Sequence, residues 1–417
     1  MRVYFKTFGC RVNQYETQSL RERVLADGST ATTDFESADL CLVNTCTVTR
    51  EADKDALTLV RRIARRNPAA RLVVTGCYAT RAPEEVQAAA PAALVVSNDR
   101  REEIPALLGC VPVPAYAGIS GFGGRARAFI KLQDGCNMSC TYCIIPSVRP
   151  DMSCRPLAGV LGEVSGLLER GFKEIVLCGI RLGRYLVEDE GGRRVDFVGL
   201  LERLSDLPGD FRVRLSSFEI TDVTERLLDL FAARPERLCP SFHLPLQSGS
   251  DATLKRMRRW YSTAFYARRL EALRARLPDA AVFTDVMAGF PGETAADFDE
   301  SEAFLRRMGF SGLHAFRYSK RSGTPAARWD GQVPDPEIKA RAARLHALDG
   351  SLRAEFAASA VGRRVRVLVE KAAGGVEAMD ERFLKVRLDR NPGPGLFWAR
   401  VSAASGAEAV GTLDPAA

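Results

Sequence analysis

The chain has 417 residues, of which 46% are hydrophobic and 27% charged, with 59 basic and 52 acidic residues and a formal net charge of +7. This length allows two or three domains with cores of their own, and the composition is that of an ordinary globular protein. No apolar run approaches the ~18 residues of a transmembrane helix, and the first residues contain no secretory signal. The sequence therefore predicts a cytoplasmic protein without a membrane partner. The modest positive charge suits a polyanionic partner as well as a solvated, arginine-rich surface.

The first part of the chain, residues 1–112, alternates apolar strands with helical segments. Strands are expected at 2–5, 39–44, 71–75 and 94–96, and helices at 13–28, between Cys46 and Asn67, and at 99–108. This alternation predicts an α/β domain with a doubly wound, mainly parallel sheet covered by helices on both faces.

Three cysteines of this domain, Cys10, Cys46 and Cys77, each stand where a predicted strand gives way to a helix. In a parallel sheet such strand ends lie along one edge, where doubly wound folds bind ligands. We therefore expect the three thiols to meet in space as a metal-cluster site with only three protein ligands. Three unrelated core cysteines are the alternative, because free cysteine is commonly buried, and four others are interpreted in that way: Cys41, Cys110, Cys178 and Cys239.

Residues 113–126 are rich in proline and glycine, which indicates a linker. Six apolar strands joined by helical patterns then follow at 129–132, 174–178, 211–216, 242–246, 282–288 and 313–318. This series predicts a partial (β/α)6 TIM-like barrel over 127–360, with its active site at the carboxyl ends of the strands. A charged helix, expected at 335–360 with an interruption at Gly350, closes the domain.

A second group of cysteines, Cys136, Cys140 and Cys143, has the spacing C-x3-C-x2-C directly after the first barrel strand. Thiolates select iron–sulfur clusters, zinc or copper over hard cations. Because an electron-transfer 4Fe-4S cluster is normally held by four cysteines, three ligands indicate a cluster with one iron open to another molecule. The alternative is a structural zinc loop completed by a distant ligand such as Cys154, although structural zinc sites more often draw their ligands in two pairs.

Turns with small or polar residues follow the later barrel strands. Small residues let a ligand approach the backbone, although ordinary turns contain the same residues, and Glu293 also suits the first turn of a helix. The candidate ligand contacts in these turns are Gly179, Ser217, Glu219, Gln247, Gly289 and Glu293.

The last part of the chain, residues 361–417, changes to short alternating strands separated by glycine turns, with strands expected at 365–370, 383–388 and 397–401. This pattern predicts a small β-barrel. Basic residues interleaved with aromatic ones are typical of a module that binds nucleic acid, and we favour RNA over a merely solvated surface. These residues are Arg363, Arg364, Arg366, Lys385, Arg387, Arg390 and Arg400, with Phe383, Phe397 and Trp398 between them.

The whole chain resembles the radical S-adenosylmethionine methylthiotransferases, which combine an N-terminal cluster domain, a radical barrel and a C-terminal TRAM-type RNA-binding barrel. Both cysteine groups fit this family, and so does Tyr142 before the third loop cysteine. Segments 8–16, 44–49 and 318–325 are most similar to the branch that converts N6-threonylcarbamoyladenosine at position 37 of tRNA to its 2-methylthio derivative. Branches that act on isopentenyladenosine tRNA or on an aspartate of a ribosomal protein remain alternatives. The sequence departs from the family pattern at Pro150, Cys154 and Cys178.

The resemblance implies two 4Fe-4S clusters, one on each cysteine group, and S-adenosylmethionine as a cofactor. It places Tyr142 near the adenine of that cofactor and makes the strand-end residues its candidate contacts. The loop cluster would generate the radical that abstracts hydrogen from C2 of the substrate adenine, because an aromatic C–H is too weak an acid for a side-chain base. The N-terminal cluster would hold the incoming sulfur, which a second S-adenosylmethionine methylates.

The implied partners are the anticodon loop of tRNA and an electron donor such as a flavodoxin or ferredoxin. A monomer is favoured, with the oligomeric state left open. A different class of protein also fits part of the pattern, namely an RNA-binding protein with two structural zinc sites and no catalytic activity.

Overall fold

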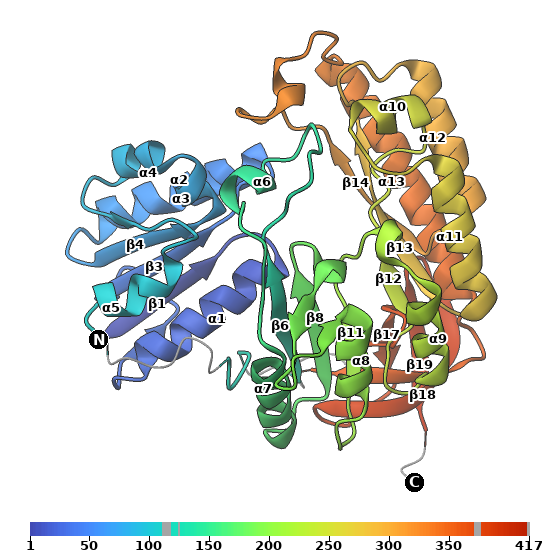
Figure 1. Cartoon of the computed structure of the whole chain (residues 1–417), viewed down its shortest axis with the longest axis horizontal. Coiled ribbons are helices and arrows are strands. Elements are labelled where there is room, and N and C mark those ends of the chain that lie inside the picture. The colour runs from blue at the N-terminus through green and yellow to red at the C-terminus, as the bar shows by residue number, and fades with distance from the viewer. Residues whose placement is uncertain (111–117, 124–125, 371–376, 415–417) are drawn as a thin grey trace.

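The computed structural model describes residues 1–110, 118–123, 126–370 and 377–414, so half of the predicted linker at 113–126 lies outside the described residues. Three units follow one another along the chain (Figure 1). They are an N-terminal sheet domain, a central half-barrel and a small C-terminal barrel, which is the predicted α/β architecture.

The N-terminal domain contains a five-stranded parallel sheet in the order β2-β1-β3-β4-β5, which confirms the doubly wound prediction. Its strands are β1 (Arg2–Thr7), β2 (Thr30–Thr32), β3 (Leu40–Thr45), β4 (Arg71–Gly76) and β5 (Leu94–Val95). The short edge strand β2 was not predicted. Helices α1 and α5 cover one face, while α2, α3 and α4 cover the other. Their bounds are α1 (Arg11–Leu25), α2 (Arg50–Arg66), α3 (Cys77–Arg81), α4 (Pro83–Ala89), the 3-10 turn η1 (Arg101–Glu103) and α5 (Ile104–Leu107).

Helix α2 shows how the sequence specifies these elements. The Thr49 hydroxyl accepts a hydrogen bond from the Ala52 amide at 3.2 Å and caps the first turn. Ala56, Val60 and Ile63 are buried on one face, at the helical spacing that the sequence shows. This apolar face anchors the helix on the sheet beside the strand that ends at the second cysteine.

The central domain is a half-open barrel whose parallel strands run in the order β6-β8-β11-β12-β13-β14, as predicted. Two sheets form it, and the parallel bridge between Ser217 and His243 joins them. The strands are β6 (Arg127–Asp134), β7 (Ser153–Cys154), β8 (Glu174–Gly179), β11 (Arg212–Leu215), β12 (Ser241–His243), β13 (Ala281–Ala288) and β14 (Gly312–Arg317), with an inserted hairpin of β9 (Leu186–Glu188) and β10 (Arg194–Asp196). The helices are α6 (Ile145–Val148), α7 (Leu157–Glu169), α8 (Phe197–Ser205), α9 (Glu225–Ala233), α10 (Asp251–Arg256), α11 (Thr263–Arg276), α12 (Ala295–Met308) and α13 (Asp335–Ala358), with 3-10 turns η2 (Leu182–Arg184), η3 (Ile220–Asp222) and η4 (Pro325–Arg328).

Helix α13 corrects the sequence analysis, because it continues without interruption through Gly350. The buried residues Leu345, Leu348 and Leu352 lie on either side of the glycine and pack into the central core. Their burial outweighs the ~1 kcal/mol by which glycine disfavours a helix relative to alanine.

We expect Gly350→Ala to raise the free energy of unfolding by about 0.5–1 kcal/mol, because a Cβ there would meet no atom within 4 Å. Urea unfolding midpoints provide the measurement. Gly289→Ala is the contrasting control, since Gly289 has φ +79° and a Cβ there would lie 2.4 Å from the Ile338 side chain of the same helix α13, so this variant should lower the midpoint. A lower midpoint for Gly350→Ala would contradict the prediction.

The C-terminal domain is a closed five-stranded barrel in the order β15-β16-β17-β19-β18, as the strand pattern predicts. Its strands are β15 (Arg364–Val369), β16 (Glu377–Met379), β17 (Lys385–Leu388), β18 (Gly395–Ser405) and β19 (Glu408–Leu413). Strands β16 and β19 were not predicted from the sequence.

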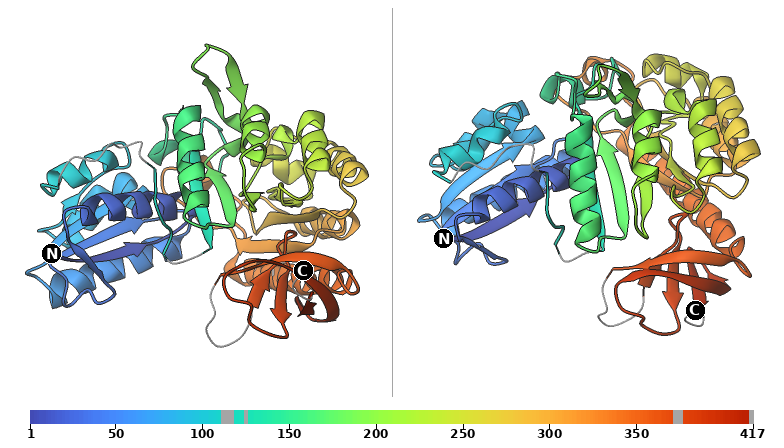
Figure 2. Two further views of the ribbon diagram at one scale, coloured as in Figure 1. Left: turned by 90° about the horizontal axis from the view of Figure 1, so that it is seen from below. Right: turned by 60° about the horizontal axis from the view of Figure 1, so that its bottom comes forward.

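This barrel packs beneath the central domain (Figure 2) through two arginines of β11. Arg212 donates to the Met379 carbonyl at 2.9 Å, and Arg214 donates to the Asp380 carbonyl at 2.8 Å. Both guanidinium groups also bind the buried carboxylate of Glu174. Burial alone would raise the pKa of Glu174, but the surrounding arginines hold it below its ordinary value. The two domains are therefore joined by a paired, buried charge cluster.

Much of the basic surface predicted for this barrel is neutralised within the protein. Arg364 pairs with Asp414, and Lys385 pairs with Glu377 and Glu408. Phe383 packs against Phe283 of the central domain instead of facing outward. In the described part of the chain, three of the predicted RNA-binding cations of this barrel have no ion pair, namely Arg387, Arg390 and Arg400. RNA binding by this surface stays a prediction.

In the parts of the chain that the structure describes, no helix is both long and apolar enough to cross a membrane.

Candidate cluster sites and the cavity between them

The structure brings the three N-terminal cysteines together at one edge of the sheet. Cys10 precedes α1, Cys46 follows β3, and Cys77 opens α3. Gly9, with φ +97°, allows a close approach, because a Cβ at this position would lie 2.7 Å from the Cys46 sulfur. The placement is the one that the parallel topology predicts. Metal binding by these thiols is taken up below as a proposal.

Polar side chains surround the Cys77 sulfur. Arg149 donates from Nε to Cys77 Sγ at 3.3 Å, and the Asn98 amide donates to the same sulfur at 3.6 Å. Burial raises the pKa of the Cys46 thiol to about 11. Because protein burial disfavours the thiolate, a bound metal centre would have to supply compensating charge.

The cysteines of the C-x3-C-x2-C loop lie between β6 and α6, at the carboxyl end of the first barrel strand. Gly135 makes the turn with φ +81°, where a Cβ would lie 2.0 Å from the Asp151 carbonyl oxygen. Arg259 donates to Cys140 Sγ at 3.3 Å and also binds Glu219, at 2.5 Å. Burial raises the pKa of Cys143 to about 12. This second thiol group therefore also has a guanidinium donor beside it.

Arg149 links the two cysteine groups. Its carbonyl accepts the amide hydrogen of Cys136 at 3.0 Å, while its side chain contacts Cys77. Its guanidinium also binds Glu16 at 2.8 Å and Asp134 at 2.7 Å. Glu16 in turn binds Lys131 and Arg101, so one buried network joins the N-terminal domain to the barrel. Burial alone would raise the pKa of Glu16, but these cations hold it well below the ordinary range.

The three sulfur atoms of each cysteine group are less close to one another than the ligand atoms of a third group of possible metal ligands. This third group consists of His243, Asp285 and His314, whose possible ligand atoms all lie within 4.8 Å of one another. Among the described residues, no other set of three His, Cys, Asp or Glu side chains is this compact. Neither cysteine triad is so compact, and the Cys154 sulfur contacts the Arg184 carbonyl at 3.7 Å. In each triad at least one pair of sulfur atoms is therefore more than 4.8 Å apart.

The structure places the predicted cofactor contacts in different surroundings. Gly179 and Ser217 line the cavity described below. Gln247 is buried with φ +74°, and its Oε1 has no hydrogen-bond partner within the described residues, so it fits a ligand contact. Tyr142 packs edge-on against Phe290, with ring centroids 6.3 Å apart.

Gly289 and Glu293 are engaged with each other and with α13. The Gly289 amide donates to Glu293 Oε1 at 3.0 Å, and Arg341 binds the same oxygen at 2.6 Å. A Cβ on Gly289 would lie 2.4 Å from the Ile338 side chain. The structure therefore shows a packing role for both residues, while their contact with a cofactor stays a prediction.

A cavity of about 570 Å³ lies inside the half-barrel. Cys10 opens onto it from the N-terminal domain, and Phe383 lines it from the C-terminal barrel. Ile145 and Ile180 line it on the loop side, where they pack against the cluster-loop cysteines. Cys10 of the N-terminal group therefore lines the cavity directly, whereas the loop cysteines lie behind Ile145 and Ile180. The volume falls in the range of about 300–1,000 Å³ usual for small-molecule sites.

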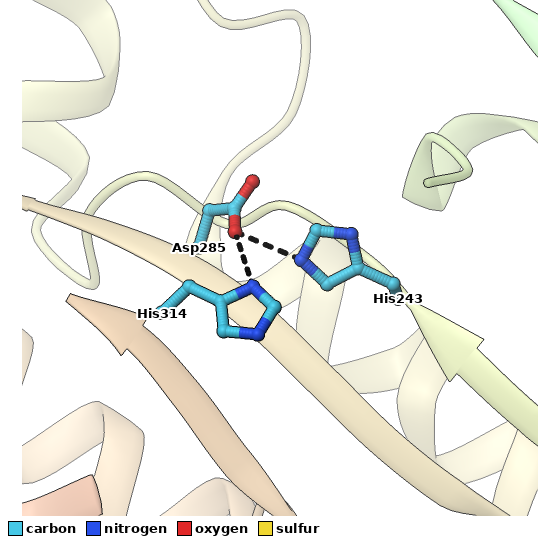
Figure 3. A group of neighbouring side chains, drawn as sticks. All are labelled: His243, Asp285 and His314. Carbon is cyan, nitrogen blue, oxygen red and sulfur yellow. Dashed lines mark hydrogen bonds and ion pairs between the residues drawn. The ribbon is translucent and has the colours of Figure 1, made fainter. Parts of the chain in front are cut away.

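One wall of this cavity carries a hydrogen-bonded group that the sequence analysis missed (Figure 3). Asp285 Oδ1 lies 2.8 Å from His243 Nε2 and 3.2 Å from His314 Nδ1, and His243 Nδ1 lies 2.7 Å from the Ser217 hydroxyl. Burial alone would raise the pKa of Asp285, but the bonds from His243 and His314 hold it at about 2. Two of the chain's three histidines fall within predicted strands, and this could have indicated the group from the sequence. Nothing in the sequence around Arg149 or Arg259 indicates that these arginines contact cysteines.

We expect the contribution of the Asp285 carboxylate to stability to depend on pH. Its depressed pKa means that the contribution, about 2 kcal/mol, is present above the ordinary aspartate pKa of ~3.9 and is lost as the pH falls toward 2. Urea unfolding of the cluster-free protein and of Asp285→Asn, compared between pH 6 and 2, measures it. A difference in free energy of unfolding that stays constant over this interval would exclude the effect.

Comparison with known proteins identifies the class. Residues 2–97 match the Uncharacterized protein family UPF0004, and residues 130–305 match the Radical SAM superfamily. The fold is similar to that of the radical S-adenosylmethionine methyltransferase TsrM from Kitasatospora setae, with a TM-score of 0.58 and 14% identity over 78% of this chain and 77% of that one. With the three-cysteine loop after the first strand of a parallel half-barrel, these matches define a radical S-adenosylmethionine enzyme.

Curated relatives narrow the class to one family. The chain is 38% identical to the threonylcarbamoyladenosine tRNA methylthiotransferase MtaB of Bacillus subtilis, over 89% of this chain and 85% of that protein. It therefore belongs to the MtaB family of radical S-adenosylmethionine methylthiotransferases. The corresponding protein of Thermotoga maritima is 36% identical over 92% and 90% of the two chains. The tRNA-2-methylthio-N(6)-dimethylallyladenosine synthase of Erythrobacter litoralis is 33% identical over 88% and 86%.

Proposed function

We propose that the protein converts N6-threonylcarbamoyladenosine at position 37 of tRNA to its 2-methylthio derivative. The observation that carries this proposal is one cavity that Cys10 of the N-terminal group lines and whose residues Ile145 and Ile180 pack against the loop cysteines, in a chain of the MtaB family. Two cluster sites at one cavity would suit a reaction in which hydrogen is removed and sulfur is added at the same carbon.

The residues present fit the implied cofactors. Cys136, Cys140 and Cys143 would hold one 4Fe-4S cluster, and the N-terminal cysteines would hold the other. The unpaired Oε1 of Gln247 and the cavity positions of Gly179 and Ser217 suit binding of S-adenosylmethionine. When bound, these groups supply one-electron reduction, hydrogen abstraction, sulfur and the methyl group.

The protein's own residues would position these groups and exclude water. Arg149 and Arg259 place a guanidinium beside a sulfur of each cysteine triad, where positive charge stabilises an anionic cluster. The apolar residues Ile145 and Ile180 lie between the cluster loop and the cavity, where they limit solvent access. An electron donor such as a flavodoxin or ferredoxin would approach from outside.

The RNA would bind through its phosphates, with the modified base splayed from the anticodon loop into the cavity. A surface hollow of about 740 Å³ between α2 and the segment after β14 supports this arrangement. Its lining includes Arg50, Lys54, Arg61 and Lys320. None of these four forms an ion pair with the described residues, so they are available for phosphate contacts.

The test uses tRNA nucleosides and defined RNAs. Deletion of the gene should remove 2-methylthio-N6-threonylcarbamoyladenosine from cellular tRNA, as measured by mass spectrometry. Anaerobically reconstituted protein should methylthiolate an anticodon stem-loop that carries threonylcarbamoyladenosine. Conversion of only the dimethylallyladenosine stem-loop would assign the other tRNA substrate, and a colourless, zinc-containing protein without iron or sulfide would overturn the proposal.

A further inference from the structure

The cavity contains one arginine side chain that has no ion pair or hydrogen bond with the described residues. Arg11 follows the first cysteine and lines the cavity, half-buried, with its guanidinium carbon 5.9 Å from the centre of the Phe129 ring. None of the described carboxylates or carbonyl groups lies within ion-pair or hydrogen-bond distance of its guanidinium.

The other charged groups of the cavity lining are all satisfied within the protein. Arg214 binds both oxygens of Glu174, and Arg353 binds Asp349 at 2.8 Å. Asp285 accepts hydrogen bonds from its two histidines. Arg11 is therefore the charge of the lining that lacks a counter-ion, and an enclosed, unpaired guanidinium favours an anionic ligand.

Arg11 does not contact a sulfur atom of the N-terminal cysteine group, although it follows Cys10 in the sequence. The side chain that contacts a sulfur of that group is Arg149, which reaches Cys77 from the opposite domain. Arg11 instead extends toward the half-barrel, where its electrostatic neighbours are Cys178 on β8 and Arg214 on β11. Its charge thus faces the cavity in which a base would lie.

We propose that Arg11 binds the carboxylate of the threonylcarbamoyl group and thereby selects this base over bases with neutral substituents. This inference rests on the proposed function and names the contact that recognises its substrate. A carboxylate is the one full negative charge that threonylcarbamoylation adds to adenine, and a planar guanidinium can bind it through two parallel hydrogen bonds. A dimethylallyl group offers no such contact.

His314 offers a second polar group to the same cavity. Its Nδ1 lies 3.2 Å from Asp285 Oδ1, and its Nε2 has no hydrogen-bond partner among the described residues, on a ring that is half-exposed. A threonyl hydroxyl can form a hydrogen bond with such a ring nitrogen. Arg11 on α1 and His314 on β14 therefore present a cation and a free ring nitrogen to one cavity.

The experiment measures charge preference in binding and in turnover separately. Anticodon stem-loops would carry threonylcarbamoyladenosine or the same group with its carboxylate converted to a carboxamide. The proteins are the reconstituted wild type, Arg11→Gln, Arg11→Lys and Arg21→Gln. Arg21 is the matched control, because it lies on the same helix with its guanidinium carbon 5.5 Å from the Phe5 ring centre and outside the cavity.

We expect the wild type and Arg21→Gln to bind the carboxylate RNA about 10- to 100-fold more tightly than the carboxamide RNA. Arg11→Gln should lose this preference, Arg11→Lys should keep part of it, and iron and sulfide content should match the wild type. A preference retained in Arg11→Gln, or an equal loss of affinity for both RNAs, would overturn the assignment. A preference that depends on Arg11 without methylthiolated product would support the contact while rejecting the proposed function.

Discussion

Cys140→Ala is expected to abolish reductive cleavage of S-adenosylmethionine, whereas Cys46→Ala should retain this cleavage and form no methylthiolated RNA. The reason is that the two residues belong to different cysteine groups, since Cys46 follows β3 in the N-terminal domain and Cys140 lies in the loop after β6. With only three thiol ligands in each group, removal of one leaves a cluster too poorly held to function. Counting deoxyadenosine and modified nucleoside by mass spectrometry in the same reaction separates the two losses.

The control for this pair is Cys41→Ala. Cys41 is fully buried in β3, five positions before Cys46, and its sulfur contacts the Phe35 carbonyl at 3.9 Å away from both thiol groups. The variant should retain cleavage, product and iron content. Normal product from Cys46→Ala would show that the two cysteine groups do not divide the chemistry as proposed.

Arg149→Gln is expected to lower the free energy of unfolding by about 3–5 kcal/mol and to reduce the iron bound at both sites. The substitution leaves the carboxylates of Glu16 and Asp134 without their shared guanidinium, in an interior where the Arg149 side chain is only 2% exposed. It also removes the donor to the Cys77 sulfur. Urea unfolding and iron analysis per protein measure the two effects.

A reciprocal variant and a surface control make this test specific. Glu16→Gln should have a similarly large effect, and the double variant should cost less than the sum, because both residues belong to one network. Arg184→Gln removes an arginine that is 48% exposed and 3.6 Å from Asp222, so its expected cost is below about 1 kcal/mol. Equal costs for Arg149→Gln and Arg184→Gln would contradict the role assigned to the buried network.

The sequence predicted the parts of the site that depend on local pattern and topology. The proximity of Cys10, Cys46 and Cys77 was predictable, because each follows an apolar strand. These strands, β1, β3 and β4, are parallel, so their carboxyl ends lie along the same edge of the sheet. The half-barrel followed from six such runs. The short strands β2 and β16, with three residues each, contain too little alternation to be recognised.

The remaining features depend on contacts between distant residues. Arg149 and Glu16 are 133 positions apart, and each looks like an ordinary surface charge until the two domains meet. The contact of His243 and His314 with Asp285 depends on the register of β12, β13 and β14, which the sequence does not specify. In the same way, the absence of a counter-ion for Arg11 is a property of the folded cavity and cannot be derived from its neighbours in sequence.

The contact between the C-terminal barrel and the cavity has a consequence for any variant that lacks the barrel. Phe383 stands in the cavity wall on a backbone with φ +72°, and Arg212 and Arg214 find their acceptors in the same C-terminal segment. Without the C-terminal barrel the cavity would lack this part of its wall, and two buried arginines would lose carbonyl acceptors. Deleting the barrel should therefore disturb the chamber of the central domain itself, in addition to any contact that the barrel makes with RNA.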